Sequence, residues 1–211
     1  LKIIFSLIFI IFKVNFFIIT NDGASQRFQN IILQVEENNN EKPWNLLKNK
    51  KNQVCFDNEN LCFFNTENEK RIFLIGDSNI ATLSSDLKDK ITNKEKYSLI
   101  VANRTACIFF PKFDTIYKKT KKKTPCNDEY FSNLKKLILK KDNNIIIFGG
   151  RLPFYISKKT FNNNEGGIEY NSFFKNRTFL RKGEFKTIEE SFQKNVEYLE
   201  KKNKIILIYP I

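Results

Sequence analysis

The sequence has 211 residues and contains neither histidine nor methionine. Because histidine is the usual base beside a nucleophilic serine or cysteine and a common metal ligand, its absence excludes a complete Ser/His/Asp triad, a Cys/His dyad and a His-ligated metal site within these residues. We expect no metal and no other cofactor. Since methionine is absent and the first residue is Leu1, we interpret the chain as a fragment of a longer protein.

The overall composition is that of a globular protein. Hydrophobic residues make up 41% of the chain and charged residues 28%, which excludes wholesale disorder, a collagen-like repeat and a polytopic membrane protein. The length fits one ordinary domain with a short appendage. We therefore expect one active site.

The formal net charge is +13, which alone would indicate nucleic acid or an anionic surface as partner. Lys, Asn, Ile and Phe are all frequent in this chain, and a general drift in composition explains that better than selection for a basic patch. No helix-turn-helix or zinc-finger fingerprint accompanies the charge. We expect no nucleic-acid partner.

The first twenty residues, LKIIFSLIFIIFKVNFFIIT, approach the roughly 20 apolar residues that cross a bilayer. Lys13 and Asn15 interrupt this run, although Lys13 lies past its centre and can reach toward the interface. A signal peptide is the alternative, but no small-residue cleavage pattern precedes Thr20. We predict a transmembrane helix over residues 1–20.

Residues 21–70 are polar and rich in Asn, which is typical of a linker or wrapping segment. Cys55 and Cys62 are close in the sequence, and so are Cys107 and Cys126. Four thiolates at these spacings are a weak zinc signal, whereas two local disulfides, Cys55–Cys62 and Cys107–Cys126, suit a membrane-tethered domain that faces an oxidising compartment. Four free thiols in a cytosolic protein are the alternative.

Past residue 70, short apolar runs alternate with stretches that carry apolar residues at helical spacing. The runs have the length and β-branched content of buried parallel strands: 71–75, 97–102, 145–148 and 204–210. The helical stretches are 80–90, with Ser85 and Asp86 in its middle, 128–140 and 188–202. This alternation predicts a three-layer α/β sandwich with a parallel sheet over residues 71–211.

Ligands of such a sheet bind beyond the carboxyl ends of its strands. The first predicted strand ends in Gly76-Asp77-Ser78, directly before a helix. Gly76 permits a tight turn, and Ser78 at a helix N-terminus is a candidate nucleophile whose own N–H helps to hold an oxyanion. An ordinary helix N-cap is the alternative, because Ser and Asp are both good caps.

Two further strand ends supply candidate donors. Asn103, Arg104 and Thr105 follow the second strand, and Gly150 and Arg151 follow the third. Glycines let the backbone approach a ligand closely, and an Asn or Arg donates to an oxyanion or carboxylate. Plain loop chemistry is the alternative.

Two loops complete the pattern. The basic run at residues 118–123 is most simply solvated surface, and at most it rests on anionic headgroups or polymers. The polar stretch from Phe161 onward is a candidate for covering a substrate.

The order of these features resembles the SGNH hydrolase-like domain that is fused to the C-terminal side of acyltransferase-3 type membrane proteins, bacterial envelope enzymes that O-acylate surface sugars. RIFLIGDSNIATL is similar to the first block of that family, and NDGASQRF is similar to the stretch that follows its last membrane helix. The cysteine pairs, IIIFGGRLPFY and FNNNEGGIE occur in similar order. The resemblance implies a flavodoxin-like three-layer sandwich.

The resemblance also implies roles for individual residues. Ser78 would be the acyl nucleophile and Asp77 a support of the turn. The oxyanion donors would be the Ser78 N–H and groups near Thr105 and Gly150 or Arg151. The Asp-x-x-His pair that supplies the base in the superfamily is missing, which we interpret as truncation, and we expect this fragment alone to be nearly inert.

By the same resemblance, the complete protein would pass an acyl group, for which we expect acetyl, through a Ser78 ester to a cell-envelope glycan hydroxyl, or remove it by hydrolysis. Its membrane part would deliver the acyl group from the cytoplasmic side. We expect it in the bacterial inner membrane, with this domain facing the periplasm. The alternatives are an inactive membrane-anchored glycan-binding or scaffold module and a basic α/β protein that binds an anion or nucleic acid.

Overall fold

The four apolar runs lie side by side in one sheet of the computed structural model, which describes residues 42–58, 61–94, 97–160 and 172–208. The sheet has five strands in the order β1-β3-β2-β5-β7. The strands β2 (Lys70–Gly76), β3 (Tyr97–Asn103), β5 (Ile145–Gly149) and β7 (Lys204–Ile208) are parallel. The short strand β1 (Cys62–Phe64) runs antiparallel to β3.

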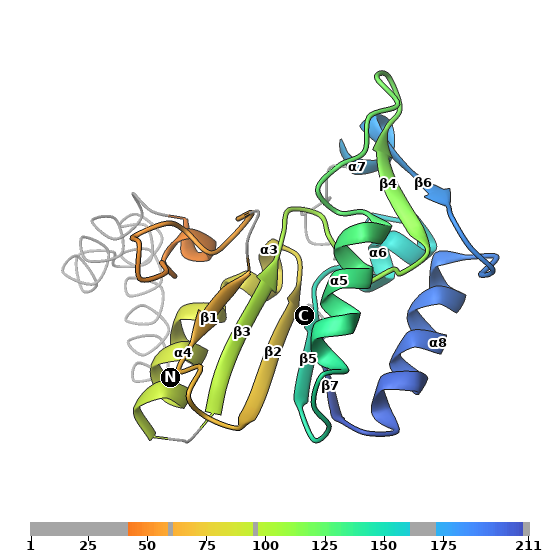
Figure 1. The fold of residues 1–211 in the computed structure, drawn as a ribbon. Helices are drawn as coiled ribbons and strands as arrows, with labels where there is room; N and C mark the ends of the chain where they lie inside the picture. The colour runs from red at the N-terminus through yellow and green to blue at the C-terminus, as the bar shows by residue number, and fades with distance from the viewer. Residues whose placement is uncertain (1–41, 59–60, 95–96, 161–171, 209–211) are drawn as a thin grey trace, which may run out of the picture. The chain divides into compact units, whose positions relative to one another are not determined.

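Helices cover both faces of this sheet (Figure 1). The helices α5 (Asp128–Ile138) and α8 (Ile188–Glu200) pack on one face, where Phe131 and Leu199 join Phe73 in the core. The other face carries α3 (Ser78–Ala81) and α4 (Ser84–Lys94), whose Ile80 and Ile91 join the core beside Leu74. The predicted three-layer α/β architecture is therefore confirmed. The four predicted strands are parallel, whereas β1, which the sequence did not predict, makes the sheet mixed.

The predicted helix over 80–90 is in fact two helices. Thr82 donates its hydroxyl to the carbonyl of Asn79, and Ser84 donates its hydroxyl to the carbonyl of Ala81. These side-chain bonds compete with the helical ladder, and the chain breaks between α3 and α4. Ser85 and Asp86 consequently lie in the first turn of α4, and the interpretation of them as mid-helix residues was wrong.

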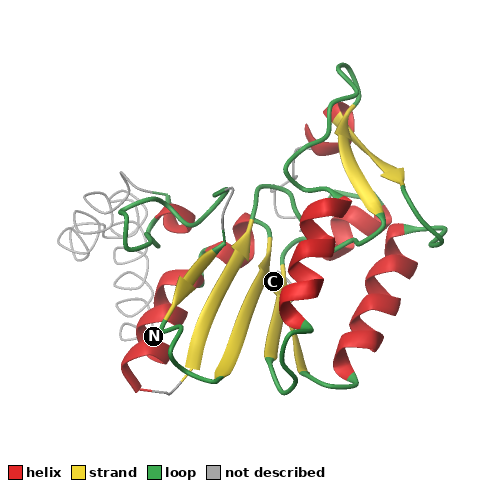
Figure 2. Cartoon of the chain, in the orientation of Figure 1, coloured by secondary structure: helices red, strands yellow, loops and turns green. Residues whose placement is uncertain are grey.

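Several short elements carry too few residues for a periodic signal. They are η2 (Pro43–Asn45), β4 (Phe113–Tyr117), α6 (Leu152–Ser157), α7 (Ser172–Asn176) and β6 (Arg177–Arg181). The strands β4 and β6 form a separate antiparallel pair, drawn in yellow beyond the main sheet in Figure 2. With α7, this pair lies on the side toward which β2 and β3 point.

The sheet includes residues from the segment that the sequence indicated as a linker. The compact unit begins at Pro43. Leu47, Cys55, Cys62 and Phe64 are buried in the same cluster as Leu74. The polar, Asn-rich composition of residues 21–70 concealed these few apolar anchors, so the described part of that segment belongs to the domain.

No helix within the described ranges is long and apolar enough to cross a bilayer. The transmembrane helix predicted at residues 1–20 lies outside the described residues. The NDGASQRF stretch and residues 161–171 of the polar loop also lie outside them.

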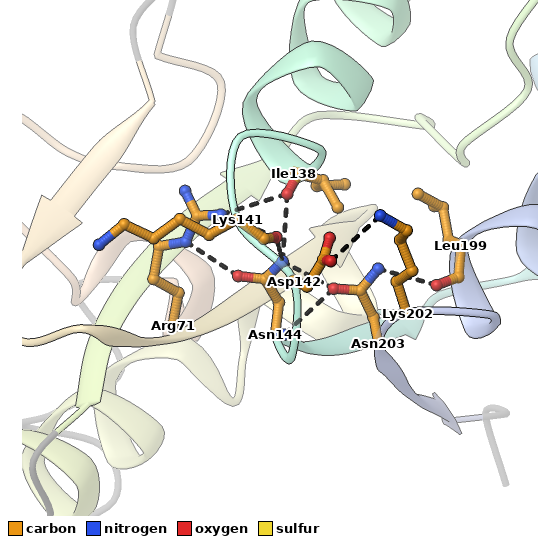
Figure 3. A network of polar contacts seen from close by, with 8 residues as sticks. All are labelled: Arg71, Ile138, Lys141, Asp142, Asn144, Leu199, Lys202 and Asn203. Carbon is orange, nitrogen blue, oxygen red and sulfur yellow. Dashed lines mark hydrogen bonds and ion pairs between the residues drawn. The ribbon is translucent and has the colours of Figure 1, made fainter.

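A polar network lies at the amino ends of the strands (Figure 3). The loops that follow the strands lie at the opposite end of the sheet. Asn144 is buried and donates to the carbonyls of Ile138 and Lys141 and to the side chain of Asn203. Arg71 donates to the side-chain oxygen of Asn144 at 2.9 Å. This network ties β2, the end of α5 and the start of β7 together at a distance from the candidate site.

Candidate active site

The predicted site residues meet at the carboxyl ends of three adjacent strands. Gly76, the last residue of β2, pairs with Asn103 at the end of β3 and with Gly149 at the end of β5. Ser78 follows at the first position of α3, with Asp77 as the N-cap. The register therefore brings the loops after β3 and β5 to either side of the Gly76–Ser78 turn.

Two glycines let these loops approach one another. Gly76 has φ +155°, and a Cβ there would lie 1.9 Å from the carbonyl oxygen of Gly149. Gly150 has φ +124°, and a Cβ there would lie 2.7 Å from the carboxyl carbon of Asp77. Both positions require glycine, because a side chain would meet its neighbour and the backbone conformation strains other residues.

The Asp77 carboxylate joins the two turns beneath Ser78. The side chain is fully buried and accepts hydrogen bonds from the N–H of Asn79 at 2.9 Å, the N–H of Arg151 at 3.0 Å and the hydroxyl of Tyr155 at 3.5 Å. The guanidinium Nε of Arg151 lies 3.7 Å from the same carboxylate. Asp77 therefore fixes the turn after β2 against the turn after β5.

Burial raises the pKa of Asp77, and the N–H donors of Arg151 and Asn79 oppose that change. Burial likewise raises the pKa of Tyr155, with the carboxylate of Asp77 adding to the effect. Tyr155 consequently stays protonated at neutral pH and donates to Asp77. Both groups lie under the turn, where they position Ser78.

Asn103 is the second polar residue of interest. Its side chain is 2% exposed, and neither its amide nitrogen nor its amide oxygen has a hydrogen-bond partner among the described residues. A buried amide without partners is costly and uncommon in folded proteins. Its position beside Gly76 makes it a candidate donor to a bound ligand.

The two neighbours of Asn103 have other partners. The N–H and the hydroxyl of Thr105 both donate to the carboxylate of Asp57. The guanidinium of Arg104 donates to the carbonyls of Pro125 and Asn58 and stacks over the ring of Tyr130. Among the groups near Thr105, the structure thus leaves the Asn103 amide as the unpartnered donor.

Sequence reasoning missed the contributions of Asp57 and Tyr155. Asp57 lies in the segment expected to be a linker, and no motif marks it. Tyr155 belongs to the quoted IIIFGGRLPFY block, but its spacing from Asp77 carries no local signal. Both residues reach the site through tertiary contacts.

Two disulfides hold the surrounding loops. Cys107 is joined to Cys126, which ties the loop after β3 to the segment before α5. Cys55 is joined to Cys62, which ties the segment before β1 to the sheet. Both pairings are those that the sequence predicted.

This arrangement provides a hydroxyl at a helix N-terminus, N–H groups without intrahelical partners at the first turn, and a buried amide beside them. Such a set suits a nucleophile with an oxyanion hole. The chain supplies no histidine to act as the base.

The comparisons with known proteins place the chain in one family. The model of the SGNH domain fused to AT3 domains matches residues 47–211, a range that includes every strand of the main sheet. A search of curated proteins and a search of solved structures each found no match.

Proposed function

The chain belongs to the family of SGNH domains fused to AT3 domains, and from this membership we propose that it is the acyl-transferring module of a membrane O-acyltransferase. Ser78 is the acyl nucleophile. The observation that carries the proposal is the buried Asp77 carboxylate, which holds the turn of Ser78 against the turn of Arg151.

The reaction has two steps in this proposal. In the first, Ser78 Oγ bonds to the carbonyl carbon of the acyl donor, the bond to the donor's leaving group breaks, and the hydroxyl proton passes through a base to that leaving group. In the second, the oxygen of an acceptor hydroxyl bonds to the acyl carbon, the bond from that carbon to Ser78 Oγ breaks, and the acceptor's proton passes through the base to Ser78 Oγ. The Ser78 N–H and the Asn103 amide donate to the oxyanion of each tetrahedral intermediate.

We place the base outside these residues. The superfamily pattern that the chain resembles uses Asp-x-x-His, and the chain contains no histidine. General base catalysis is worth about 10² to 10⁴ in rate, so a serine without it reacts slowly. An added base should therefore restore part of the reactivity of Ser78.

The acceptor that we propose is a hydroxyl of a cell-envelope glycan, and acetyl is the acyl group. A membrane part of the same protein delivers that group from the cytoplasmic side. The domain faces the periplasm from the bacterial inner membrane. The predicted span at residues 1–20 and the two disulfides support this placement.

The test is covalent labelling of the full chain with a fluorophosphonate, with and without added imidazole as an exogenous base. We expect one adduct on Ser78 by peptide mass spectrometry and about a tenfold or greater acceleration by imidazole. Ser78→Ala should abolish the adduct, whereas Ser85→Ala on α4 should leave the labelling rate unchanged. Equal labelling of the Ser78→Ala variant, or no adduct on Ser78 even with imidazole, would contradict the proposal.

The absence of histidine favours a second candidate, a membrane-anchored glycan-binding or scaffold module that has the fold without the chemistry. The same experiment separates the two candidates. An inactive module predicts that imidazole does not bring the rate of Ser78 above that of other partly exposed serines.

A further inference from the structure

A cavity of about 740 Å³ lies directly beside the candidate active site. Thr105 and Arg151, which follow β3 and β5, line one side of it, and residues of the β4 end, α7 and β6 line the other. Ligand sites for small molecules typically measure about 300 to 1,000 Å³. The cavity is therefore large enough for one or a few sugar units within reach of the Ser78 turn.

The charge of the lining is one-sided. Lys119, Lys122, Lys123, Arg151 and Arg177 line the cavity, and no Asp or Glu of the described residues does. Within that set, Lys123 is paired with Asp114 at 2.9 Å, and Arg151 lies near Asp77. Two of the five lining cations therefore have a carboxylate nearby. The other three line the cavity without one among the described residues.

The remaining cations are Lys119, Lys122 and Arg177. In the part of the chain that the structure describes, none of them has a carboxylate at ion-pair distance. Three positive charges around one concave surface repel one another, which costs free energy unless an anion is bound. The arrangement thus favours an anionic ligand.

Hydrogen bonds hold the basic turn in place. The N–H of Tyr117 donates to the carbonyl of Lys122, and the N–H of Lys121 donates to the carbonyl of Tyr117. Lys118 donates its backbone N–H to the carbonyl of Asn176 and its Nζ to the carbonyl of Phe174. The backbone of the turn is fixed to α7, so the positions from which Lys119 and Lys122 extend are set before a ligand arrives.

The rest of the lining suits a sugar. Tyr117 is 37% exposed, and the Arg177 guanidinium lies 5.3 Å from the centroid of its ring and 5.6 Å from that of the Phe173 ring. Thr120 and Asn176 add a hydroxyl and an amide to the wall. A concave wall with an aromatic ring and polar groups suits a saccharide. Nucleic acid would need a longer groove, and a bilayer would need a flat face.

We propose that this cavity binds an anionic saccharide, a sugar bearing a carboxylate or a phosphate, and that such a sugar is the acyl acceptor. The second half of this statement rests on the proposed function, whereas the first half does not. The basic run at residues 118–123 is then a binding element rather than solvated surface.

The test is isothermal titration calorimetry on the full chain in a nonionic detergent. The probes are trigalacturonic acid and glucose 6-phosphate, with maltotriose as the neutral saccharide and inorganic phosphate as the anion without a sugar. We expect binding of at least one anionic saccharide, weakening as salt increases, and at least about tenfold weaker binding of maltotriose and of inorganic phosphate. The stronger of the two anionic saccharides identifies the acidic group.

The variant Lys119→Gln/Lys122→Gln/Arg177→Gln should lose about tenfold or more in affinity, because each removed cation is a charged hydrogen-bond donor to the ligand. The matched control, Lys90→Gln/Lys136→Gln/Lys140→Gln, removes the same charge from α4 and from the α5 region. It should bind within about twofold of the parent chain. Equal losses in both variants would overturn the cavity as the site, because net charge alone would then explain the binding.

Other outcomes are equally decisive. Equal binding of maltotriose or of inorganic phosphate, tighter binding of duplex DNA, or no binding at all would overturn the proposal. Ser78 is not among the described residues that line the cavity, so Ser78→Ala should keep the parent affinity. Binding without fluorophosphonate labelling of Ser78 would contradict the proposed function and support the cavity, and labelling without binding would do the reverse.

Discussion

At the scale of single residues, Asn103 is expected to lower the stability of the fold and to assist the reaction of Ser78. Its amide is buried at the end of β3 without a partner in the described structure. An unpaired buried amide costs about 1 to 3 kcal/mol of stability. A residue that is unfavourable for folding and pairs with Gly76, two residues before the candidate nucleophile, is a candidate donor to an oxyanion.

We predict that Asn103→Leu raises the free energy of unfolding by about 1 kcal/mol, because it replaces the amide by an apolar side chain of similar size. The same change should lower the rate of Ser78 labelling by about 100-fold, the usual effect of removing one oxyanion donor. Urea denaturation and labelling kinetics measure the two effects. Asn133→Leu, at an exposed position on α5, is the control for both.

A loss of both stability and labelling rate in Asn103→Leu would indicate a structural role and contradict the assignment. An unchanged labelling rate would exclude Asn103 as a donor. The assignment requires the two quantities to move in opposite directions.

Individual residues also show what the sequence can reveal about the site. The Gly-Asp-Ser turn predicted Ser78 and Asp77, because a buried strand followed by a helix start is a local pattern. The same pattern could not show that Thr105 would be bound by Asp57, since these residues are far apart in the sequence. The role of Asp77 as a link to Arg151 and Tyr155 also depends on the register of β2 and β5.

At the scale of elements, the end of α5 depends on a cap from another part of the chain. The guanidinium of Arg71, on β2, donates to the carbonyls of Leu137, Ile138 and Lys141. The backbone N–H groups of Lys140 and Lys141 reach the carbonyls of Leu137 and Ile138 only at 3.4 and 3.5 Å, so Arg71 adds a charged donor where the helical ladder ends, and a cation there also complements the helix dipole. Arg71 therefore stabilises α5 and joins it to the sheet.

We predict that Arg71→Ala lowers the free energy of unfolding by about 2 to 3 kcal/mol, because it removes a charged donor from the end of α5 and leaves the side-chain oxygen of the buried Asn144 without its Arg71 donor. Arg71→Lys should recover part of the loss, since a lysine keeps the charge but not the forked donor geometry. Arg181→Ala, at an exposed position on β6, is the control. Urea denaturation measures all three, and equal stability of Arg71→Ala and Arg181→Ala would contradict the prediction.

The elements that the sequence predicted are those with a local signal. The runs at β2, β3, β5 and β7 are strongly apolar, and α5 and α8 have helical periodicity with the caps Asn127 and Thr187. The strands β1, β4 and β6 have three to five residues and exist through their partners, so composition alone does not reveal them. The break between α3 and α4 depends on the hydrogen bonds of two single hydroxyls, those of Thr82 and Ser84. A periodicity of apolar residues, which is judged over many positions, does not show it.

At the scale of the whole molecule, two disulfides restrict different parts of the unfolded chain. Cys55–Cys62 spans a sequence separation of 7, whereas Cys107–Cys126 spans 19 and encloses β4 and the basic turn of the cavity. In the chain-entropy description, the stabilisation grows with the length of the closed loop. The longer loop should therefore depend more on its disulfide for stability, and the cavity should depend on it for shape.

We predict that Cys107→Ala/Cys126→Ala lowers the free energy of unfolding by about 3 kcal/mol and Cys55→Ala/Cys62→Ala by about 2 kcal/mol. The first pair should also weaken the binding of the anionic saccharide, because Lys119 and Lys122 lie within its loop. The second pair is the matched control, since it removes two buried cysteines on the other side of the sheet. Urea denaturation and calorimetry on the same samples measure both effects.

Equal losses of affinity in the two variants would mean that global stability, rather than the position of the basic turn, controls binding. An unchanged affinity in Cys107→Ala/Cys126→Ala would show that other contacts, such as those of Lys118 with α7, hold the turn by themselves.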